Sequence, residues 1–582
     1  MKYPTLYTKE SSRQMVDVFK GYNHNLRIGD GEFFNMKNMT SDHYPVLSPR
    51  GHRGAYASPS NPTGLIAKDA LCYVDGTKFV TNEYSLDMGL NDEPKQLISM
   101  GAYVIIMPDK KWVNTLDRTH GNIEAHFDNE ESKVDVSFSL CTIDGADYEG
   151  MTISNNEPAE PENLALWIDT SSTPHTLKQY SKSSSTWVQI ATTYIKISCP
   201  GIGAAFNQYD GVTISGIKAD ALQDLNASMV IWAKGDDYIV VVGILDEVIS
   251  QPVDIGAISV DRKMPSMDFI IESENRLWGC KYGVANNGAV VNEIYASKLG
   301  DFKNWDCRMN ISTDSYVASC GTDGQFTGAI THMGYPLFFK ENCLHKVYGN
   351  YPANFQIQTT ACRGVQKDCD KSLAIVNETL YYKSRSGVCA YDGSLPVEVS
   401  YALGDMHYGR AVAGAHGNKY YISMQEAISP EYSLFVYDTA KGMWHKEDNL
   451  QVDCFCSCRG ELYAISGGKI LTMLGSGDPW ERNVEWMAET GEIGISSPDM
   501  KYVSRLTLRM SMDIDAEVSI YAQYDFSDEW ECQCVLRSNN LRSFSIPIRP
   551  KRCDHMKLRI EGVGSVKIYS ITKTIEQGSE LS

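Results

Sequence analysis

Four aspartates, Asp109, Asp144, Asp210 and Asp392, lie near expected turns and are the first carboxylates to weigh for acid–base chemistry. Paired carboxylates cleave glycosidic bonds, one as general acid and the other as base or nucleophile. Asp392, in "AYDGSLP", is the most tempting of the four, but Asp-Gly after a strand is a standard turn signal. A sialidase should also repeat an S-x-D-x-G-x-x-W box, and no copy is evident. We therefore expect turn residues and no catalytic residue.

Other motifs for catalysis or cofactor binding are equally weak. The sequence contains no G-x-S-x-G, no H-E-x-x-H and no P-loop. Two glycine-rich stretches, "GDGEF" (29–33) and "GSGDPW" (475–480), lack the strand-to-helix context that phosphate binding needs. We interpret both as turns and expect no cofactor and no cofactor-binding residue.

Metal-ligand spacing is also missing. His332, His345, His407 and His416 are scattered, and no C-x-x-C pair is present. Two groups of the sixteen cysteines alternate along the chain, in "DCFCSC" (453–458) and "ECQC" (531–534). Alternation places these side chains in parallel on one face of a strand, a poor geometry for a bridge within it. We expect free thiols, mostly buried or half-buried, and no metal site; metal or redox function is the alternative.

The charge balance bears on partners. The formal net charge is −20, whereas a protein that grips the DNA backbone carries basic patches. An acidic surface favours solubility, and near DNA it also prevents sticking. Only "PKRCDHMKLR" (550–559) gathers basic residues, Lys551, Arg552, Lys557 and Arg559. This segment is either a solvated strand edge that discourages unwanted pairing or an edge that faces an acidic partner subunit.

Neither the N-terminus nor the longest apolar run suggests a membrane segment. The first residues, "MKYPTLYTKESSRQMVDVF", have no apolar core of the length that a signal peptide needs. The run "YIVVVGIL" (238–245) is far too short to span a bilayer as a helix. We expect a soluble protein that is made in a cytoplasm and has no membrane-spanning segment.

One pattern recurs along the chain: a turn, then a pair led by leucine or tyrosine with an aromatic residue, then alternating strands. Its copies are Leu71 with Tyr73, Leu277-Trp278, Leu337-Phe338, Leu380-Tyr381, Tyr420-Tyr421 and Leu462-Tyr463. The late copies are separated by 43, 40 and 42 residues. A period of roughly 40–45 residues that holds several short strands is typical of β-propeller blades. We interpret residues 275–305 as one blade segment, and Trp305 and Trp444 as packing between sheets.

At 582 residues the chain should form several domains, and its 10% aromatics and frequent glycine favour strands joined by tight turns. The fold class we expect is all-β, a β-propeller with an inserted small β domain and a C-terminal β-sandwich-like domain. The expected boundaries are 1–58 for an N-terminal extended arm, 59–118 for the first part of the propeller, 119–229 for the inserted domain, 230–490 for the remaining blades and 491–582 for the C-terminal domain. The sequence does not fix the number of blades, and five to seven are compatible.

A family resemblance rests on "NMTSDHYPVLSPRGHRG", "ENRLWGCKYG…NEIYASKLGDFKNW" and "LYYKSRSGVCAYDGSLPVEVS". With these phrases the chain resembles the β-propeller proteins of tailed-bacteriophage tails, namely nozzle, hub and DNA-stabilisation proteins. The resemblance covers most of residues 20–120 and 230–490. It implies a homohexameric ring in the virion tail, around the DNA-ejection channel below the portal and adaptor and beside tail-fibre proteins. Genomic DNA would pass without specific binding, and the subunit would be made in the host cytoplasm.

Two further functions are alternatives. The inserted domain could recognise a receptor or glycan, since its Trp167–Trp187 stretch is rich in aromatic and hydroxyl groups that suit sugar contacts. Alternatively, the propeller could be a glycosidase that acts on the cell surface.

Overall fold

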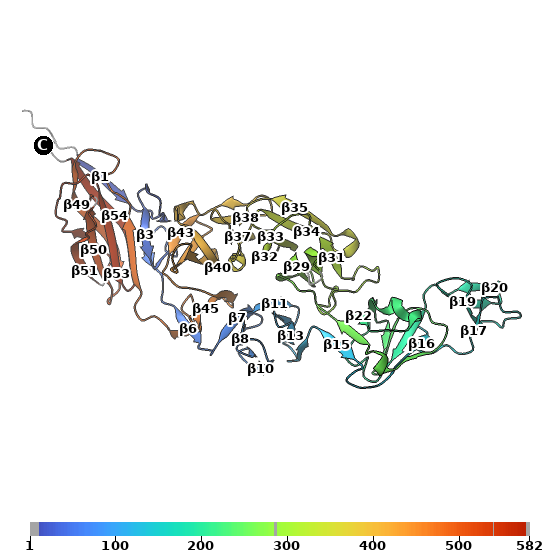
Figure 1. Cartoon of the computed structure of the whole chain (residues 1–582). Helices are drawn as coiled ribbons and strands as arrows, with labels where there is room; N and C mark the ends of the chain where they lie inside the picture. Colours follow the sequence, from blue (N-terminus) through green and yellow to red (C-terminus); the bar gives the residue numbers. More distant parts are fainter. Residues whose placement is uncertain (1–10, 285–287, 526, 539, 578–582) are drawn as a thin grey trace, which may run out of the picture. The chain divides into compact units, whose positions relative to one another are not determined.

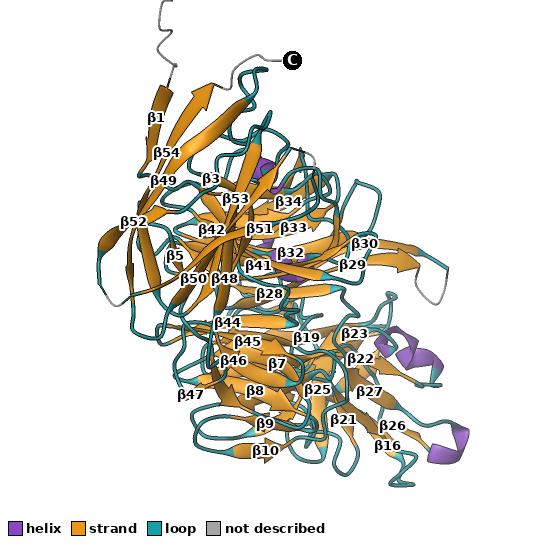
Figure 2. Cartoon of the chain, turned by 90° about the vertical axis from the view of Figure 1, so that its left-hand side faces the viewer, coloured by secondary structure: helices purple, strands orange, loops and turns teal. Residues whose placement is uncertain are grey.

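Strands dominate the protein, as Figure 2 shows in orange. The computed structural model describes residues 11–284, 288–525, 527–538 and 540–577. These residues form two compact units, which we describe separately: unit 1 is Met1–Lys95, Phe338–His345 and Thr359–Ser582, and unit 2 is Gln96–Leu337 and Lys346–Gln358. The helical segments in the described ranges are five 3₁₀ turns, η1 (Asp220–Leu225), η2 (Val253–Ile255), η3 (Pro352–Asn354), η4 (Asp370–Ser372) and η5 (Tyr401–Leu403). None of the described helices has the length and apolar character needed to cross a membrane.

Unit 1 contains four sheets of propeller-blade type, each a run of consecutive strands (Figure 1). They are β36 (Ala374–Val376), β37 (Thr379–Lys383), β38 (Val388–Tyr391) and β39 (Val397–Glu398); β40 (Tyr408–His416), β41 (Lys419–Glu426), β42 (Tyr432–Asp438) and β43 (Met443–Lys446); β44 (Cys454–Cys458), β45 (Glu461–Ser466) and β46 (Lys469–Thr472); and β7 (Pro62–Ala67), β8 (Leu71–Asp75), β9 (Lys78–Val80) and β10 (Ser85–Asp87). Their first strands contact one another in the order β36, β40, β44, β7. Contact between the first strands of successive sheets is the arrangement of a propeller around its axis.

One of these sheets joins distant parts of the chain. The strand β6 (Gly54–Ala57) pairs antiparallel with β46 and with β47 (Asp478–Pro479). A strand from near one end of the propeller thereby completes a sheet made by strands from the other end. Propellers use such mixed sheets to close, because the unpaired edge of the last blade is otherwise exposed.

Unit 2 contains two further sheets of blade type. They are β11 (Gln96–Met100), β12 (Tyr103–Met107), β13 (Lys111–Asn114) and β14 (His120–Asn122); and β28 (Phe269–Ser273), β29 (Arg276–Val284), β30 (Val290–Ala296) and β31 (Tyr316–Ser319). Their first strands, β11 and β28, contact each other and share a core that includes Ile105, Leu277 and Trp305. A seventh sheet of the described residues, β32 (Phe326–His332), β33 (Tyr335–Lys340), β34 (Cys343–Tyr348) and β35 (Gln356–Ala361), has residues in both units.

The inserted domain lies within unit 2 and has two sheets around its own core. One sheet holds β15 (Ala125–Asp128), β27 (Ser259–Arg262), β22 (Gly211–Ser215) and β23 (Ser228–Val230); the other holds β24 (Ala233–Lys234), β25 (Tyr238–Val242), β21 (Tyr194–Ser198), β16 (Val136–Cys141) and β26 (Ile249–Gln251). Val212 and Val260 of the first sheet pack in one cluster with Phe138 and Val241 of the second. A smaller sheet follows β16 in the chain, with β17 (Thr152–Ser154), β18 (Leu166–Asp169), β19 (Thr176–Ser181) and β20 (Thr186–Gln189).

The C-terminal domain is a β-sandwich-like pair of sheets in unit 1. One sheet is β1 (Ser11–Val16), β54 (Val566–Gln577), β49 (Lys501–Met512) and β52 (Arg542–Ile546). The strands of the other are β2 (Gly21–Tyr22), β3 (Glu32–Lys37), β48 (Glu485–Thr490), β53 (Met556–Val563), β50 (Glu517–Tyr524) and β51 (Glu531–Arg537). A short pair, β4 (Met39–Thr40) and β5 (Ser48–Pro49), follows β3. Buried residues alternate along β49 and β50, as expected for strands with one face against a core.

The predicted fold class is confirmed, and the repeat has a structural meaning. Every aromatic pair singled out in the sequence lies on the second strand of its sheet, namely β8, β29, β33, β37, β41 and β45. The second strand is an inner strand, paired on both sides, and most residues of β33 and β37 are buried. The sheet of β11–β14 is also of blade type but lacks a pair singled out in the sequence; its second strand is "YVIIM" (103–107).

Strand pairing differs from two of the expected boundaries. Strands β23–β27, residues 228–262, pair with β16, β21, β22 and β15, so the two-sheet insertion extends past residue 229. The insertion leaves after β14 and returns before β28, so it lies between two sheets of blade type. The described residues of the expected N-terminal arm, 11–57, form strands that pair with β54, β43, β48 and β46.

Candidate functional site

The four aspartates weighed for catalysis lie in separate turns or in a buried ion pair. Asp392 accepts hydrogen bonds from the backbone N–H and the hydroxyl of Ser394, at 3.0 and 2.6 Å, and so forms the turn after β38. Asp144 is exposed in the turn after β16, and Asp109 lies in the turn between β12 and β13. Asp210 is buried and is ion-paired with Arg262. Asp392 and Asp210 therefore have structural roles, and Asp144 and Asp210 adjoin strands of different sheets, β16 and β22.

Asp210 also contacts residues 275–305, the stretch interpreted above as a blade segment. Asn304, in "DFKNW", is fully buried and donates from its amide to Asp210 Oδ1 at 2.9 Å, while its own Oδ1 accepts from the N–H of Gly211 at 2.9 Å. Trp305 donates from Nε1 to the Phe302 carbonyl at 2.9 Å and packs in the core of its sheet. The loop that closes this blade thus contacts the inserted domain, and the segment is structural.

The four histidines lie on separate strands and turns. No group of three or more His, Cys, Asp or Glu side chains in the described ranges could hold a metal ion. His345 is fully buried beside Thr359, and burial, with a smaller contribution from Lys340, lowers its pKa to about 4. His407 is exposed and contacts the Asp405 carbonyl. His332 and His416 lie on β32 and β40.

All sixteen cysteines are free thiols. The alternating groups lie on strands, Cys454, Cys456 and Cys458 on β44 and Cys532 and Cys534 on β51. Burial raises the pKa of Cys456 to about 12, with smaller contributions from the neighbouring thiols. A thiol with so high a pKa is a poor nucleophile at neutral pH, because the thiolate is the reactive form.

The basic segment 550–559 is largely engaged within the chain. Lys551 forms an ion pair with Glu531 at 2.8 Å, and Arg559 one with Glu489 at 3.1 Å. The Arg559 guanidinium also stacks over Trp530, 4.0 Å from the ring centre, and Lys557 Nζ lies 4.8 Å from the ring centre of Phe34. These contacts favour a structural edge over a surface reserved for a partner.

The aromatic stretch of the inserted domain packs on itself. Trp167 is 5% exposed and donates from Nε1 to the Ser154 carbonyl at 3.0 Å. Its ring meets that of Trp187 edge to face at 5.4 Å, and Trp187 contacts Tyr180 at 5.3 Å. Lys178 Nζ lies 4.6 Å from the centre of the Trp167 ring. The face of Trp167 is therefore occupied by this chain's own side chains.

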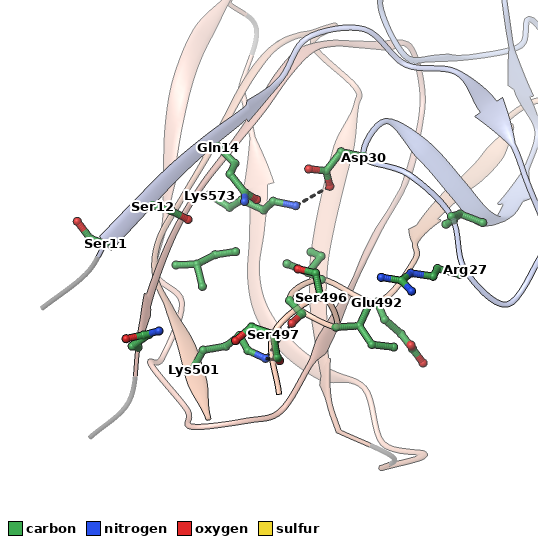
Figure 3. A pocket seen from close by; sticks show the side chains of 16 residues that line it. Ser11, Ser12, Gln14, Arg27, Asp30, Glu492, Ser496, Ser497, Lys501 and Lys573 are labelled. Atoms are coloured by element: carbon green, nitrogen blue, oxygen red, sulfur yellow. Dashed lines mark hydrogen bonds and ion pairs between the residues drawn. The ribbon is translucent and has the colours of Figure 1, made fainter. Parts of the chain in front are cut away.

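A polar cavity of about 620 Å³ lies in unit 1 between β1, β54 and the loop 492–497 (Figure 3). It contains two buried lysines, Lys573 and Lys501. Lys573 forms an ion pair with Asp30 of "GDGEF" at 2.6 Å. Lys501 donates to the carbonyls of Gly494 and Ser497, at 2.8 and 2.6 Å, and to that of Asp554. Lys573 thus has a counter-ion and Lys501 three acceptors within the chain, and Lys501 holds the loop in place.

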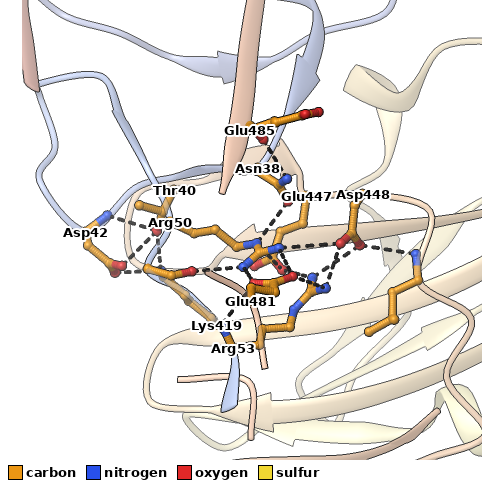
Figure 4. Close-up of polar contacts among 12 residues, drawn as sticks. Asn38, Thr40, Asp42, Arg50, Arg53, Lys419, Glu447, Asp448, Glu481 and Glu485 are labelled. Atoms are coloured by element: carbon orange, nitrogen blue, oxygen red, sulfur yellow. Dashed lines mark hydrogen bonds and ion pairs between the residues drawn. The ribbon is translucent and has the colours of Figure 1, made fainter. Parts of the chain in front are cut away.

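A buried ionic network, which we call the junction network, consists of Arg50, Arg53, Glu447, Asp448 and Glu481 (Figure 4). Arg53 is 1% exposed and donates to Glu447 Oε2 and to Asp448 Oδ2, each at 2.6 Å. Arg50 donates through two nitrogens to the two carboxylate oxygens of Glu481, at 2.7 and 2.9 Å. Such two-pronged pairs are the strong form of the arginine–carboxylate contact.

The network joins three parts of unit 1 that are far apart in the sequence. Glu447 and Asp448 directly follow β43, Arg50 and Arg53 precede β6, and Glu481 follows β47. Asn38 adds two links, because its N–H donates to the Glu447 carbonyl at 2.6 Å and its side chain to the Glu485 carbonyl at 2.8 Å. A blade end, the N-terminal segment and the entry to the C-terminal domain are thus held at one point.

Charge explains the ionisation of the network. Burial alone would lower the pKa of Arg53, but Glu447 and Asp448 raise it, so the guanidinium stays charged. Burial would raise the pKa of Asp448 and of Glu481; the nearby arginines, through charge and hydrogen bonds, instead lower both. The sequence analysis missed this network, since it used "SPRGHRG" only for the family resemblance. Two arginines three residues apart in an otherwise acidic chain were the available signal.

No protein-family model and no curated protein matches the chain. Several solved structures are similar in fold: an exo-β-1,3-galactanase from Phanerochaete chrysosporium (10% identity, 52% of this chain and 94% of that one, TM-score 0.22), the β-propeller domain of the Trilobed protease from Pyrococcus furiosus (9%, 73% and 98%, 0.26) and the endosialidase of phage phi92 (9%, 77% and 69%, 0.24). With identities of 9–10% and TM-scores of 0.22–0.26, no activity is transferred from them.

Proposed function

We propose that the chain is a non-catalytic structural subunit of a bacteriophage tail. In this proposal it is a nozzle or hub protein that forms a homohexameric ring around the DNA-ejection channel. The ring would lie below the portal and adaptor, and tail-fibre proteins would attach nearby. The family resemblance of the sequence supplies the class, and one feature of unit 1 supports it.

That feature is a ten-stranded sheet that continues from a propeller blade into the C-terminal domain. Its strand order is β40-β41-β42-β43-β2-β3-β48-β53-β50-β51. The link is β2, where Tyr22 pairs with Trp444 of β43 on one side and with Phe33 of β3 on the other. Any movement of the blade relative to the C-terminal domain would break ladder hydrogen bonds.

The junction network strengthens the same connection. Glu447 and Asp448 extend from the blade strand β43, and Arg50 and Arg53 lie between β5 and β6. Lys419 of β41 adds an ion pair with Asp42 at 2.6 Å, and Ser41 donates to Asp438 Oδ2 at 2.6 Å. A rigid connection suits a part that carries load in an assembly, whereas a hinged lid or binding module needs freedom to move.

The charge of the chain is compatible with a wall along which DNA slides. At −20 the subunit repels phosphates on average, so passing DNA would find few sites of attraction. This supports the proposal without specifying it, because many soluble proteins are acidic.

Two measurements test the proposed function. The purified chain should form closed rings of about six copies, to be counted by native mass spectrometry and viewed by negative-stain microscopy. In virions of a phage that encodes it, a gold-labelled antibody should mark the tail. A chain that stays monomeric at all concentrations, together with label that is absent from the tail, would contradict the proposal.

The alternative functions lack a comparable observation. A glycan reader would present open aromatic faces, whereas Trp167 is covered by Lys178 and Trp187. A propeller glycosidase would bring carboxylates together, whereas Asp392 forms a turn and Asp210 is neutralised by Arg262. We therefore advance neither of them as a second proposal.

A further inference from the structure

Lys383, the last residue of β37, is a buried cation without a counter-ion. It is 3% exposed. Its ammonium donates to the side-chain carbonyl of Gln366 at 2.8 Å and to the backbone carbonyl of Ser384. In the part of the chain that the structure describes, it forms no ion pair. An ammonium has three N–H donors, so one of them has no acceptor here.

Three other buried cations of unit 1 have an anionic partner or a full set of acceptors. Arg53 faces two carboxylates, Lys573 faces Asp30, and Lys501 donates to three carbonyls. Burying an ammonium without an anion is costly, because the protein interior replaces only part of its hydration. Burial accordingly lowers the pKa of Lys383. A charge left in this state suggests that its partner is not part of the chain.

Lys383 contributes to the wall of a cavity of about 240 Å³. The wall also contains the tight turn 384–387 and the segment from Ser400 to Tyr408. Gly387 lets the turn lie close to Ser400, since a Cβ there would lie 2.0 Å from Ser400 Oγ. The turn carries Arg385, which lines the same cavity, is exposed and makes no ion pair among the described residues. One buried and one exposed cation therefore border a single space.

Among the described residues, the two acids that line this cavity form no ion pair with either cation, although the charge of Glu398 still acts on Lys383. Glu398 is paired with Arg363 at 2.7 Å and also accepts from Ser400. Asp405 is exposed and contributes its backbone carbonyl to His407. An anion inside the cavity would meet the free N–H of Lys383 and the guanidinium of Arg385, both groups that bind oxyanions.

We propose that this cavity is a binding site for a small oxyanion, a phosphate or a carboxylate, held between Lys383 and Arg385. The anion accepts the third N–H of Lys383 and supplies the missing negative charge, while Arg385 binds it from the solvent side. The site does not depend on ring assembly, so the proposed function can fail without affecting this proposal, and the reverse.

Isothermal titration calorimetry on the full chain tests the site. Inorganic phosphate is titrated at constant ionic strength, with chloride as the balancing anion, and acetate is titrated in a second arm. We expect saturable binding of at least one of them by the wild type. Lys383→Met should weaken it at least tenfold, and Arg385→Gln several-fold. Lys367→Met, which removes an exposed lysine of a neighbouring loop, should leave it unchanged.

The variants also separate binding from folding. Lys383→Met removes an uncompensated buried charge and keeps most of the side-chain volume, so its unfolding temperature in chloride should not fall. Phosphate or acetate, whichever binds, should raise the unfolding temperature of the wild type but not that of Lys383→Met. If Lys383→Met fails to fold, Arg385→Gln decides, because its side chain is exposed. No binding of either anion, or equal binding by wild type and Arg385→Gln, would overturn the proposal.

Discussion

Arg53 is the residue on which the junction network depends most. Its guanidinium donates to Glu447 and Asp448 at 2.6 Å, and its backbone N–H donates to Glu481 at 2.9 Å. A carboxylate that keeps its charge in a buried site needs a cation close by. We predict that Arg53→Met lowers the free energy of unfolding of unit 1 by about 3–5 kcal/mol, the usual effect of removing one partner of a buried pair. Urea denaturation followed by tryptophan fluorescence measures it.

Lys37→Met is the matched control for this variant. Lys37 forms an ion pair with Glu485 at 2.9 Å in the same region, but its side chain is 46% exposed and that of Glu485 71%. Solvated pairs contribute about 0–1 kcal/mol. Equal losses for Arg53→Met and Lys37→Met would show that burial of the network adds nothing to stability.

The network should also lose its effect in acid. The pKa values of Asp448 and Glu481 are lowered in the folded chain, so folding is favoured where both are ionised. A carboxyl with a depressed pKa contributes stability that is fully present above its unfolded pKa, about 4, and is lost as the pH falls through its folded pKa. We predict that the difference in unfolding temperature between wild type and Arg53→Met is constant from pH 7 to pH 5 and shrinks below about pH 4. A difference that grows in acid would contradict the assignment.

At the scale of elements, strand β2 is the connection between blade and C-terminal domain. Gly21 has φ +84°, and a Cβ there would lie 2.3 Å from the Trp444 carbonyl oxygen of β43. An alanine would therefore adopt an unfavourable backbone conformation and would also push β2 away from β43. We predict that Gly21→Ala costs about 1–3 kcal/mol and speeds amide hydrogen exchange in β2 and β43. Gly51→Ala, at a position with no atom within 4 Å of the added Cβ, is the control and should change neither.

A strand could be predicted from the sequence where its own residues identify it, but not where its assignment depends on a distant pairing partner. The pairs led by Leu277, Leu380 and Leu462 identify second strands because enclosure on both sides selects apolar and aromatic residues. The end of the insertion was misplaced because "YIVVVGIL" (238–245) has the same composition as a blade strand, although β25 pairs with β21. Periodicity gives the burial of a strand, and only its partner gives the sheet to which it belongs.

The candidate sites show the same limit. The turn role of Asp392 follows from its neighbours along the chain, and its position after β38 agrees with it. In "GSGDPW" the prediction of a turn is only partly right, because Asp478 and Pro479 form β47, which pairs with the distant strand β6. The junction network combines residues that lie hundreds of positions apart in the sequence. The Lys383 cavity depends on a buried lysine that has no ion-pair partner among the described residues. For Lys383, "YYKSRSG" contains no pattern that distinguishes a buried lysine from an exposed one.

At the scale of the whole molecule, net charge gives a prediction that needs no knowledge of ring geometry. With 73 Asp and Glu against 53 Lys and Arg, the chain is strongly acidic at pH 7. Binding to duplex DNA gains most of its free energy from cations that displace counterions, and the strength falls steeply with salt. Much of the only basic segment is occupied, since Lys551 pairs with Glu531 and Arg559 with Glu489.

We therefore predict that the full chain does not bind duplex DNA, even at about 50 mM salt, where electrostatic attraction is strong. Fluorescence anisotropy of a labelled duplex should stay flat up to about 10 μM protein, below which many basic proteins already bind non-specifically at low salt. A basic DNA-binding protein in the same assay is the positive control. If the anisotropy rose and the affinity fell with the logarithm of the salt concentration, a concentrated basic surface would have to exist, and the slope would count its phosphate contacts. Such a surface would hold the genome instead of letting it slide, which is incompatible with a smooth ejection channel.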